Sequence, residues 1–117
     1  MDSSILNLAL ALDRVGGDRE LLQEVAQVFL EASPELLQRV QKAVADRDSK
    51  ALEQAAHALK GSVGNFAAED VYQAAMRLEK MGRSGNLDGV EKALADLEAE
   101  MVRLSPALVD LSSGGPK

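Results

Sequence analysis

The sequence predicts an all-α fold, an antiparallel up-and-down four-helix bundle with a short N-terminal helix as a lid. Apolar residues recur at intervals of three and four along most of the chain, and this spacing is typical of amphipathic helices. Aromatic residues make up only 3% of the chain, whereas residues that lose little on entering a helix, such as Ala, Leu, Glu, Gln, Arg and Lys, are abundant. With 117 residues the chain is long enough for one buried core, and helices joined by short connections favour a bundle.

The first helix is short and is predicted to close one end of the bundle. Asp2, Ser3 or Ser4 is expected to be its N-cap, and Gly16 with Gly17 to end it. Its apolar residues recur at helical spacing: Ile5, Leu8, Ala9, Leu12 and Val15.

The second helix is predicted to run from about 18 to 46, with Asp18 as its N-cap. Its apolar residues keep one phase through Pro34: Leu22, Val25, Phe29, Ala32, Leu36, Val40 and Ala43. Two separate helices would have no reason to keep register, so we expect one helix, bent where the Pro34 ring meets the carbonyl of Leu30. The alternative is a new helix with Ser33 as N-cap and Pro34 in its first turn. Phe29, Ala32 and Leu36 are expected to be interior.

Two further helices follow a polar turn at residues 46–49. The first, about 49 to 65, is capped by Asp48 or Ser49. The second runs from about 68 to 81 and is expected to stop at Gly82 in a left-handed C-cap, before a loop at 83–86. Its inward residues are Val71, Tyr72, Ala75, Leu78 and Met81.

The last helix carries the most regular apolar stripe, with alternating steps of three and four residues. The stripe consists of Leu87, Val90, Leu94, Leu97, Met101 and Leu104. Leu108 and Leu111 keep its phase beyond Pro106, which allows a kinked extension. We therefore expect one domain over residues 1–111 and a flexible tail over 112–117.

Composition excludes several classes of function. The chain has no cysteine and one histidine, so it can build neither a disulfide framework nor a His/Cys metal site, and no cofactor is expected. A formal net charge of −6 argues against nucleic acid and favours a protein partner. No apolar run approaches the roughly 20 residues that span a bilayer, and no basic, signal-like N-terminus is present. We expect a cytoplasmic protein without membrane contact of its own.

The only histidine, His57, is the candidate functional residue. At about 100° per residue it points away from the apolar side of its helix and should face water. That apolar side comprises Leu52, Ala55, Leu59, Ser62, Val63 and Phe66. Beside His57 on the outward face lie Lys60, Gly61 and Gly64.

The two outward glycines call for a reason, because together they cost on the order of 1–2 kcal/mol in a helix. Core packing cannot be that reason. Bare backbone at Gly61 and Gly64 would let another protein approach His57, while Lys60 supplies positive charge for an anionic group. A phosphoryl group meets both demands, although an idle surface histidine and an ordinary solvated lysine are the simpler alternatives.

Three more residues of this helix are assigned from their register. Glu53 and Gln54 precede His57 on its face and either line a contact rim or are merely solvated. Ser62 turns toward the edge of the core, where its hydroxyl packs or bonds its own helix.

The run AHALKGS, residues 56–62, resembles the signature of histidine-containing phosphotransfer (HPt) domains, the carrier modules of bacterial two-component phosphorelays. The similarity extends to residues 17–22 followed by Phe29, to residues 32–37 and to Leu78-Glu79, and covers about residues 5 to 105. One departure is Ala67, where the family usually has glycine.

This resemblance implies that His57 is the phosphoacceptor. It would take a phosphoryl group from a receiver-domain aspartate and pass it to another receiver aspartate, reacting through Nε2 while Nδ1 makes a hydrogen bond. The resemblance also implies that the receiver brings Mg²⁺, that the carrier is not an enzyme on its own, and that apolar residues near the histidine dock the receiver's first helix. We expect a monomer whose partners are response-regulator receivers or a hybrid sensor kinase. Candidate docking residues are Leu10, Leu21 and Leu37.

Two other functions stay open at this point. The chain could be the phosphotransfer domain of a chemotaxis-type kinase, labelled directly by an ATP-bound kinase domain. It could also be a helical adaptor that binds partners without carrying phosphate.

Overall fold

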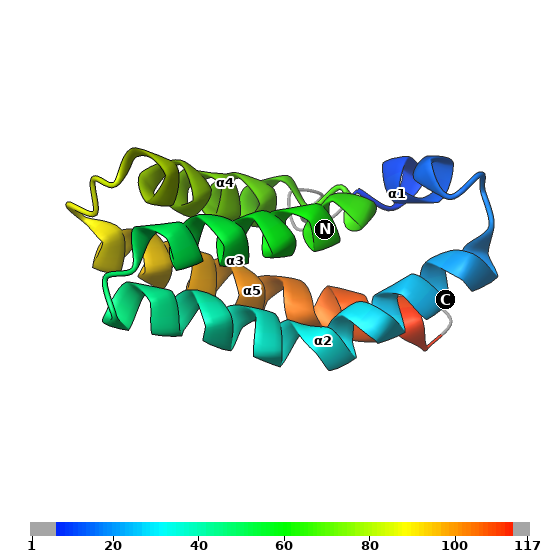
Figure 1. Cartoon of the computed structure of the whole chain (residues 1–117). Helices are drawn as coiled ribbons and strands as arrows, with labels where there is room; N and C mark the ends of the chain where they lie inside the picture. The colour runs from blue at the N-terminus through cyan, green and yellow to red at the C-terminus, as the bar shows by residue number, and fades with distance from the viewer. Residues whose placement is uncertain (1–6, 114–117) are drawn as a thin grey trace.

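The computed structural model describes residues 7–113, and every regular element in that range is a helix (Figure 1). The predicted all-helical class is therefore confirmed. The elements are α1 Leu8–Arg14, α2 Arg19–Ala45, α3 Ser49–Val63, the 3-10 turn η1 Gly64–Phe66, α4 Glu69–Ser84 and α5 Val90–Ser112.

Helix α1 starts later than predicted. Asn7 is its N-cap and accepts a hydrogen bond from the amide of Leu10 at 3.1 Å. The expected caps Asp2, Ser3 and Ser4, together with Ile5, lie outside the described residues. Gly16 and Gly17 both have positive φ and turn the chain into α2, as expected.

Helix α2 runs without a break through Pro34, so the alternative of a new helix capped by Ser33 is wrong. The proline removes the amide that would bond the carbonyl of Leu30. The Ser33 hydroxyl donates to that carbonyl instead, at 3.4 Å. Phe29 is buried and Leu36 is half-buried, but Ala32 is exposed, because it borders an open groove rather than the core.

Helix α3 is capped by Asp48 and gives way to η1 after Val63. The prediction for α4 was wrong at its end, since the helix continues to Ser84 and Gly85 is the left-handed C-cap with φ 77°. Gly82 lies inside α4 and is buried, and Arg83 and Ser84 are helical rather than in a loop. Helix α5 continues through Pro106 to Ser112, and Leu108 and Leu111 are buried.

The helices pack so that α3 and α5 do not share a major contact. Helices α2 and α4 each pack on both α3 and α5, and α1 contacts η1 and the start of α2 (Figure 1). Phe29 of α2 meets Phe66 of η1 edge-on in the core, with ring centroids 5.6 Å apart. Each large apolar side chain buried in this way contributes about 1.5–3 kcal/mol. In the described part of the chain, no helix is both long and apolar enough to cross a membrane.

Candidate functional site

His57 stands on the outer side of α3. Its side chain is 67% exposed, although five other residues of the same helix are buried. Those residues are Leu52, Ala55, Ala56, Leu59 and Val63. The burial of one side of α3 therefore fixes the direction of His57, which faces solvent as its register predicts.

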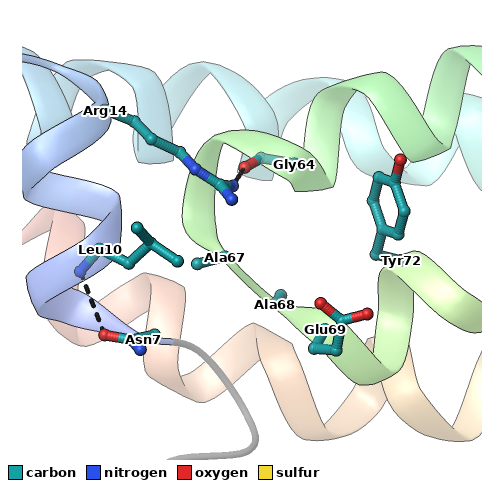
Figure 2. Close-up of a pocket in the computed structure, with 8 residues that line it drawn as sticks. All are labelled: Asn7, Leu10, Arg14, Gly64, Ala67, Ala68, Glu69 and Tyr72. Atoms are coloured by element: carbon teal, nitrogen blue, oxygen red, sulfur yellow. Dashed lines mark hydrogen bonds between the residues drawn. The ribbon is translucent and has the colours of Figure 1, made fainter.

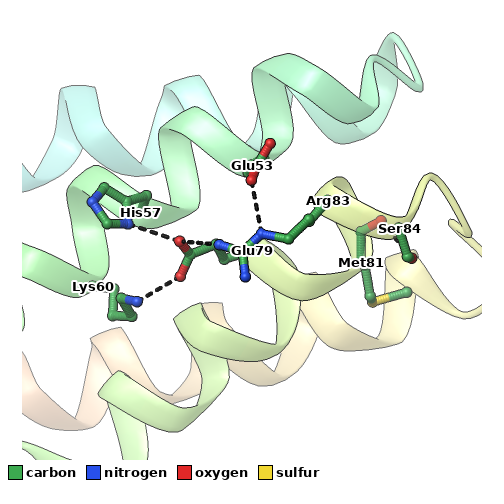
Figure 3. Close-up of polar contacts among 7 residues, drawn as sticks. All are labelled: Glu53, His57, Lys60, Glu79, Met81, Arg83 and Ser84. Carbon is green, nitrogen blue, oxygen red and sulfur yellow. Dashed lines mark hydrogen bonds and ion pairs between the residues drawn. The ribbon is translucent and has the colours of Figure 1, made fainter.

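The exposed ring is held from below by a buried carboxylate. Glu79 of α4 is only 3% exposed, and its Oε2 lies 2.7 Å from His57 Nδ1 (Figure 3). An ionised carboxylate only accepts hydrogen bonds, so Nδ1 must carry the proton. In the neutral ring Nε2 then keeps its lone pair. The contact leaves that nitrogen on the side of the ring away from Glu79.

Glu79 is ionised because two α3 side chains and one from its own helix surround it. Lys60 Nζ lies 2.7 Å from Oε1, and Arg83 Nη2 lies 3.1 Å from Oε2 (Figure 3). Burial raises the pKa of Glu79, but the hydrogen bonds from Lys60 and then His57 outweigh burial, and the net pKa is below its ordinary value. The carboxylate is thus charged at neutral pH despite its burial.

Arg83 links this cluster to Glu53. Its Nε donates to Glu53 Oε2 at 2.9 Å, which raises the pKa of the guanidinium further, with Glu79 adding to the effect. Glu53, predicted as a rim residue, therefore belongs to the network. Gln54 does not: it is exposed and borders a separate groove between α2 and α3.

The comparison with protein families and the comparison with solved structures point to the same kind of domain. The family model described as "Hpt domain" matches residues 24–107. The chain belongs to the Hpt domain family. Members of this family carry phosphoryl groups on histidine in two-component phosphorelays and are phosphocarrier modules rather than catalysts.

One solved structure has the same fold. It is the crystal structure of the HPT domain from a sensor hybrid histidine kinase of Shewanella, with a TM-score of 0.85 and 19% sequence identity over 96% of this chain and 97% of that one. At that identity the likeness shows the fold alone. A comparison with curated proteins found no matching relative.

The glycines of this Hpt domain leave open space beside His57. A Cβ at Gly61 would meet nothing within 4 Å, and one at Gly64 would meet only the Tyr72 ring, at 3.9 Å. Gly64 lies in η1 rather than in α3, and its carbonyl accepts a hydrogen bond from Arg14 of α1 (Figure 2). Helix α1 is thus bonded to η1, directly after the helix that carries His57.

Lys60 occupies a less open position than its sequence suggested. Its side chain is only 20% exposed. Its ammonium group forms the ion pair with Glu79 and lies 5.8 Å from the centroid of the Tyr72 ring. The Ser62 hydroxyl donates a hydrogen bond to the carbonyl of Ala58 in its own helix, at 3.1 Å. This is one of the two roles predicted for Ser62.

An apolar groove runs along α2 toward the end of α3. It is lined by Leu21, Glu24, Val25, Val28, Phe29, Ala32, Ser62 and Asn65. Of the three docking candidates, Leu10 and Leu21 are exposed, whereas Leu37 is half-buried against the core. Val28, which sequence reasoning missed, is the most exposed large apolar side chain of α2.

Sequence reasoning also missed the roles of Glu79 and Arg83. A signal was present for Glu79, because it falls four residues after Ala75, on the stripe that α4 buries. An acidic residue at an interior position must find a cationic partner. Nothing in the sequence shows that this partner would be His57 and Lys60 of another helix.

Proposed function

We propose that this Hpt domain is a phosphorelay carrier that accepts a phosphoryl group on His57 from a receiver-domain aspartate and passes it to a second receiver aspartate. The observation that carries the proposal is the exposed His57 ring, whose Nδ1 is bonded to a buried, ionised Glu79 at 2.7 Å. This arrangement offers Nε2 to a partner as a nucleophile.

The transfer balances without an added proton carrier. The Nε2 lone pair attacks the phosphorus of the aspartyl phosphate, an N–P bond forms, and the receiver's carboxylate leaves with the electrons of the broken P–O bond. The ring becomes a phosphoimidazolium whose Nδ1 proton remains on the hydrogen bond to Glu79. The second transfer is the reverse reaction with another receiver aspartate.

The remaining parts of the site assist this step. Lys60 contributes positive charge near the phosphoryl group from its place on Glu79, since phosphoryl transfer depends on neutralising charge and on in-line positioning. Gly61 and Gly64 leave room for the receiver to approach His57. Glu53 forms part of the rim of the contact surface and is bonded there by Arg83. The receiver supplies Mg²⁺ and most of the catalysis.

The receiver docks on the apolar groove of α2. Leu21 and Val28 are exposed there, and Ser62 and Asn65 connect the groove to the histidine helix. An exposed apolar patch of this kind marks a protein-binding surface. We propose that the module acts as a monomeric, antiparallel up-and-down bundle of α2 to α5, with α1 as its lid.

The test is phosphotransfer from a labelled receiver. Wild type should acquire an acid-labile, alkali-stable label and return it to a second receiver, whereas His57→Gln should acquire none. Gln54→Ala, outside the network, is the matched control and should behave as wild type. Label that persists on His57→Gln would refute the site.

The donor that labels the protein separates the alternatives. Labelling by ATP with a kinase domain, and not by phosphoreceivers, would favour the chemotaxis-kinase type of domain. Unchanged partner affinity and biological output in His57→Ala would favour an adaptor that carries no phosphate.

A further inference from the structure

Gly82 marks the closest approach of the two helices that build the site. It is buried inside α4, and a Cβ there would lie 2.5 Å from the amide nitrogen of Glu53 and 2.6 Å from the carbonyl oxygen of Ser49. Both atoms belong to the backbone of α3, so no side-chain rotation can relieve the clash. Only glycine allows the helices to lie this close.

The hydrogen bonds of the site span the same interface. Glu79, one turn before Gly82 in α4, reaches His57 and Lys60 of α3, each at 2.7 Å. Arg83, the next residue, reaches Glu53 at 2.9 Å. Along α4, Gly82 therefore lies between Glu79, which bonds His57 and Lys60, and Arg83, which bonds Glu53.

We infer that Gly82 is a positioning residue for His57: it sets the separation of α3 and α4 at which the buried Glu79 can hold the Nδ1 proton. The inference rests on the proposed role of Nε2 as the nucleophile. The glycine does not touch the ring and acts only through the distance between the helices.

The size of the expected displacement can be worked out from the contact. A real Cβ is not found within 3.0 Å of such atoms, so an alanine at position 82 must move α4 away from α3 by about half an ångström or more. A 2.7 Å bond that lengthens by this amount leaves the range of strong, charge-assisted hydrogen bonds. The proton on Nδ1 is then no longer held, and the ring is free to adopt the Nε2–H tautomer and other orientations.

The test uses the full chain with Gly82→Ala and measures the ring of His57 by ¹H–¹⁵N NMR at a pH where the imidazole is neutral. Wild type should show the Nδ1–H tautomer, and Gly82→Ala should shift the population toward Nε2–H and slow phosphotransfer by roughly tenfold, as for other carboxylates that orient a histidine. Val40→Ala, which truncates a fully buried side chain of α2, is the control for lost stability alone. It should keep the wild-type tautomer.

A folded Gly82→Ala with the wild-type tautomer would overturn the inference. If the variant does not fold, it is measured again together with Ala67→Gly, which relieves the left-handed φ of 52° at Ala67, and with an osmolyte that favours burial. Failure to fold even then would make Gly82 a folding determinant only, which also overturns the positioning role. If wild type takes no label but the tautomer shifts as expected, the proposed function fails and the positioning role stands.

Discussion

Removing the carboxylate of Glu79 should both destabilise the protein and impair His57. Glu79 accepts hydrogen bonds from His57, Lys60 and Arg83 while only 3% exposed. The contacts to His57 and Arg83 involve exposed partners and contribute less than about 1 kcal/mol each. The contact to Lys60 is the buried one, and leaving one member of a buried pair alone costs about 3–5 kcal/mol.

Because Lys60 retains one-fifth of its exposure, the low end of that range applies. We expect Glu79→Ala to lower the free energy of unfolding by about 3 kcal/mol at neutral pH. Glu79→Gln, which keeps the shape and one acceptor oxygen, should lose less. Both variants should slow phosphotransfer by about 10- to 100-fold, because the ring loses the group that orients it.

The contribution of the Glu79 carboxylate to stability should depend on pH. The folded-state pKa of Glu79 is below the ordinary value of 4.5, so the carboxylate stabilises the fold fully above about pH 4.5, and this contribution is lost as the pH falls through the lowered pKa. The difference between wild type and Glu79→Gln in urea denaturation should therefore be largest at neutral pH and shrink in acid.

Two results would refute this reasoning. One is a loss below about 1 kcal/mol in Glu79→Ala, which would place the carboxylate among ordinary surface pairs. The other is a wild-type to Glu79→Gln difference that stays the same at neutral and acid pH.

Three other substitutions test the remaining parts of the site and the fold. Gly61→Ala should raise the free energy of unfolding by about 0.5–1 kcal/mol in urea denaturation, since its Cβ meets nothing within 4 Å. The same variant should slow phosphotransfer from a receiver, and an unchanged rate would contradict the clearance role. Ala67→Gly should stabilise the protein by about 0.5 kcal/mol, because Ala67 has φ 52° and alanine is strained there, whereas Ala68→Gly, at ordinary φ, should not. Val28→Lys should weaken receiver binding measured by calorimetry about tenfold or more, with little change in stability. Val102→Lys, at a more exposed position on α5, should bind as wild type, and equal affinities for both variants would remove the groove from the docking surface.

The course of α2 illustrates how much of the fold can be predicted from the spacing of apolar residues. Seven apolar residues in one phase indicated a continuous helix, and burial of that stripe outweighs the hydrogen bond lost at Pro34. Ala32 shares the phase of these residues but is exposed. Periodicity gives the direction in which a side chain points, but it does not show whether a neighbouring helix covers that position.

Gly82 shows where local reasoning stops. A glycine near the end of an amphipathic segment has the same local signature whether it turns the chain or lets a neighbouring helix approach. The sequence predicted Gly82 as the C-cap, but Gly85 has that role, and Gly82 lies inside α4 against the backbone of α3. That contact joins residues some thirty positions apart and has no trace in the local pattern.

The ring of His57 shows why the site needs a second helix at all. A histidine that a partner must reach cannot be held by packing, because packing would cover Nε2. A hydrogen bond from one side fixes the ring without covering it, but an exposed acceptor would be mobile and screened by solvent. Burying Glu79 gives a rigid acceptor, and the cost of burying its charge is offset by Lys60 and Arg83. The position of His57 follows from the sequence of α3 alone, whereas the choice of the ring nitrogen that carries the proton depends on how closely α4 is packed against α3.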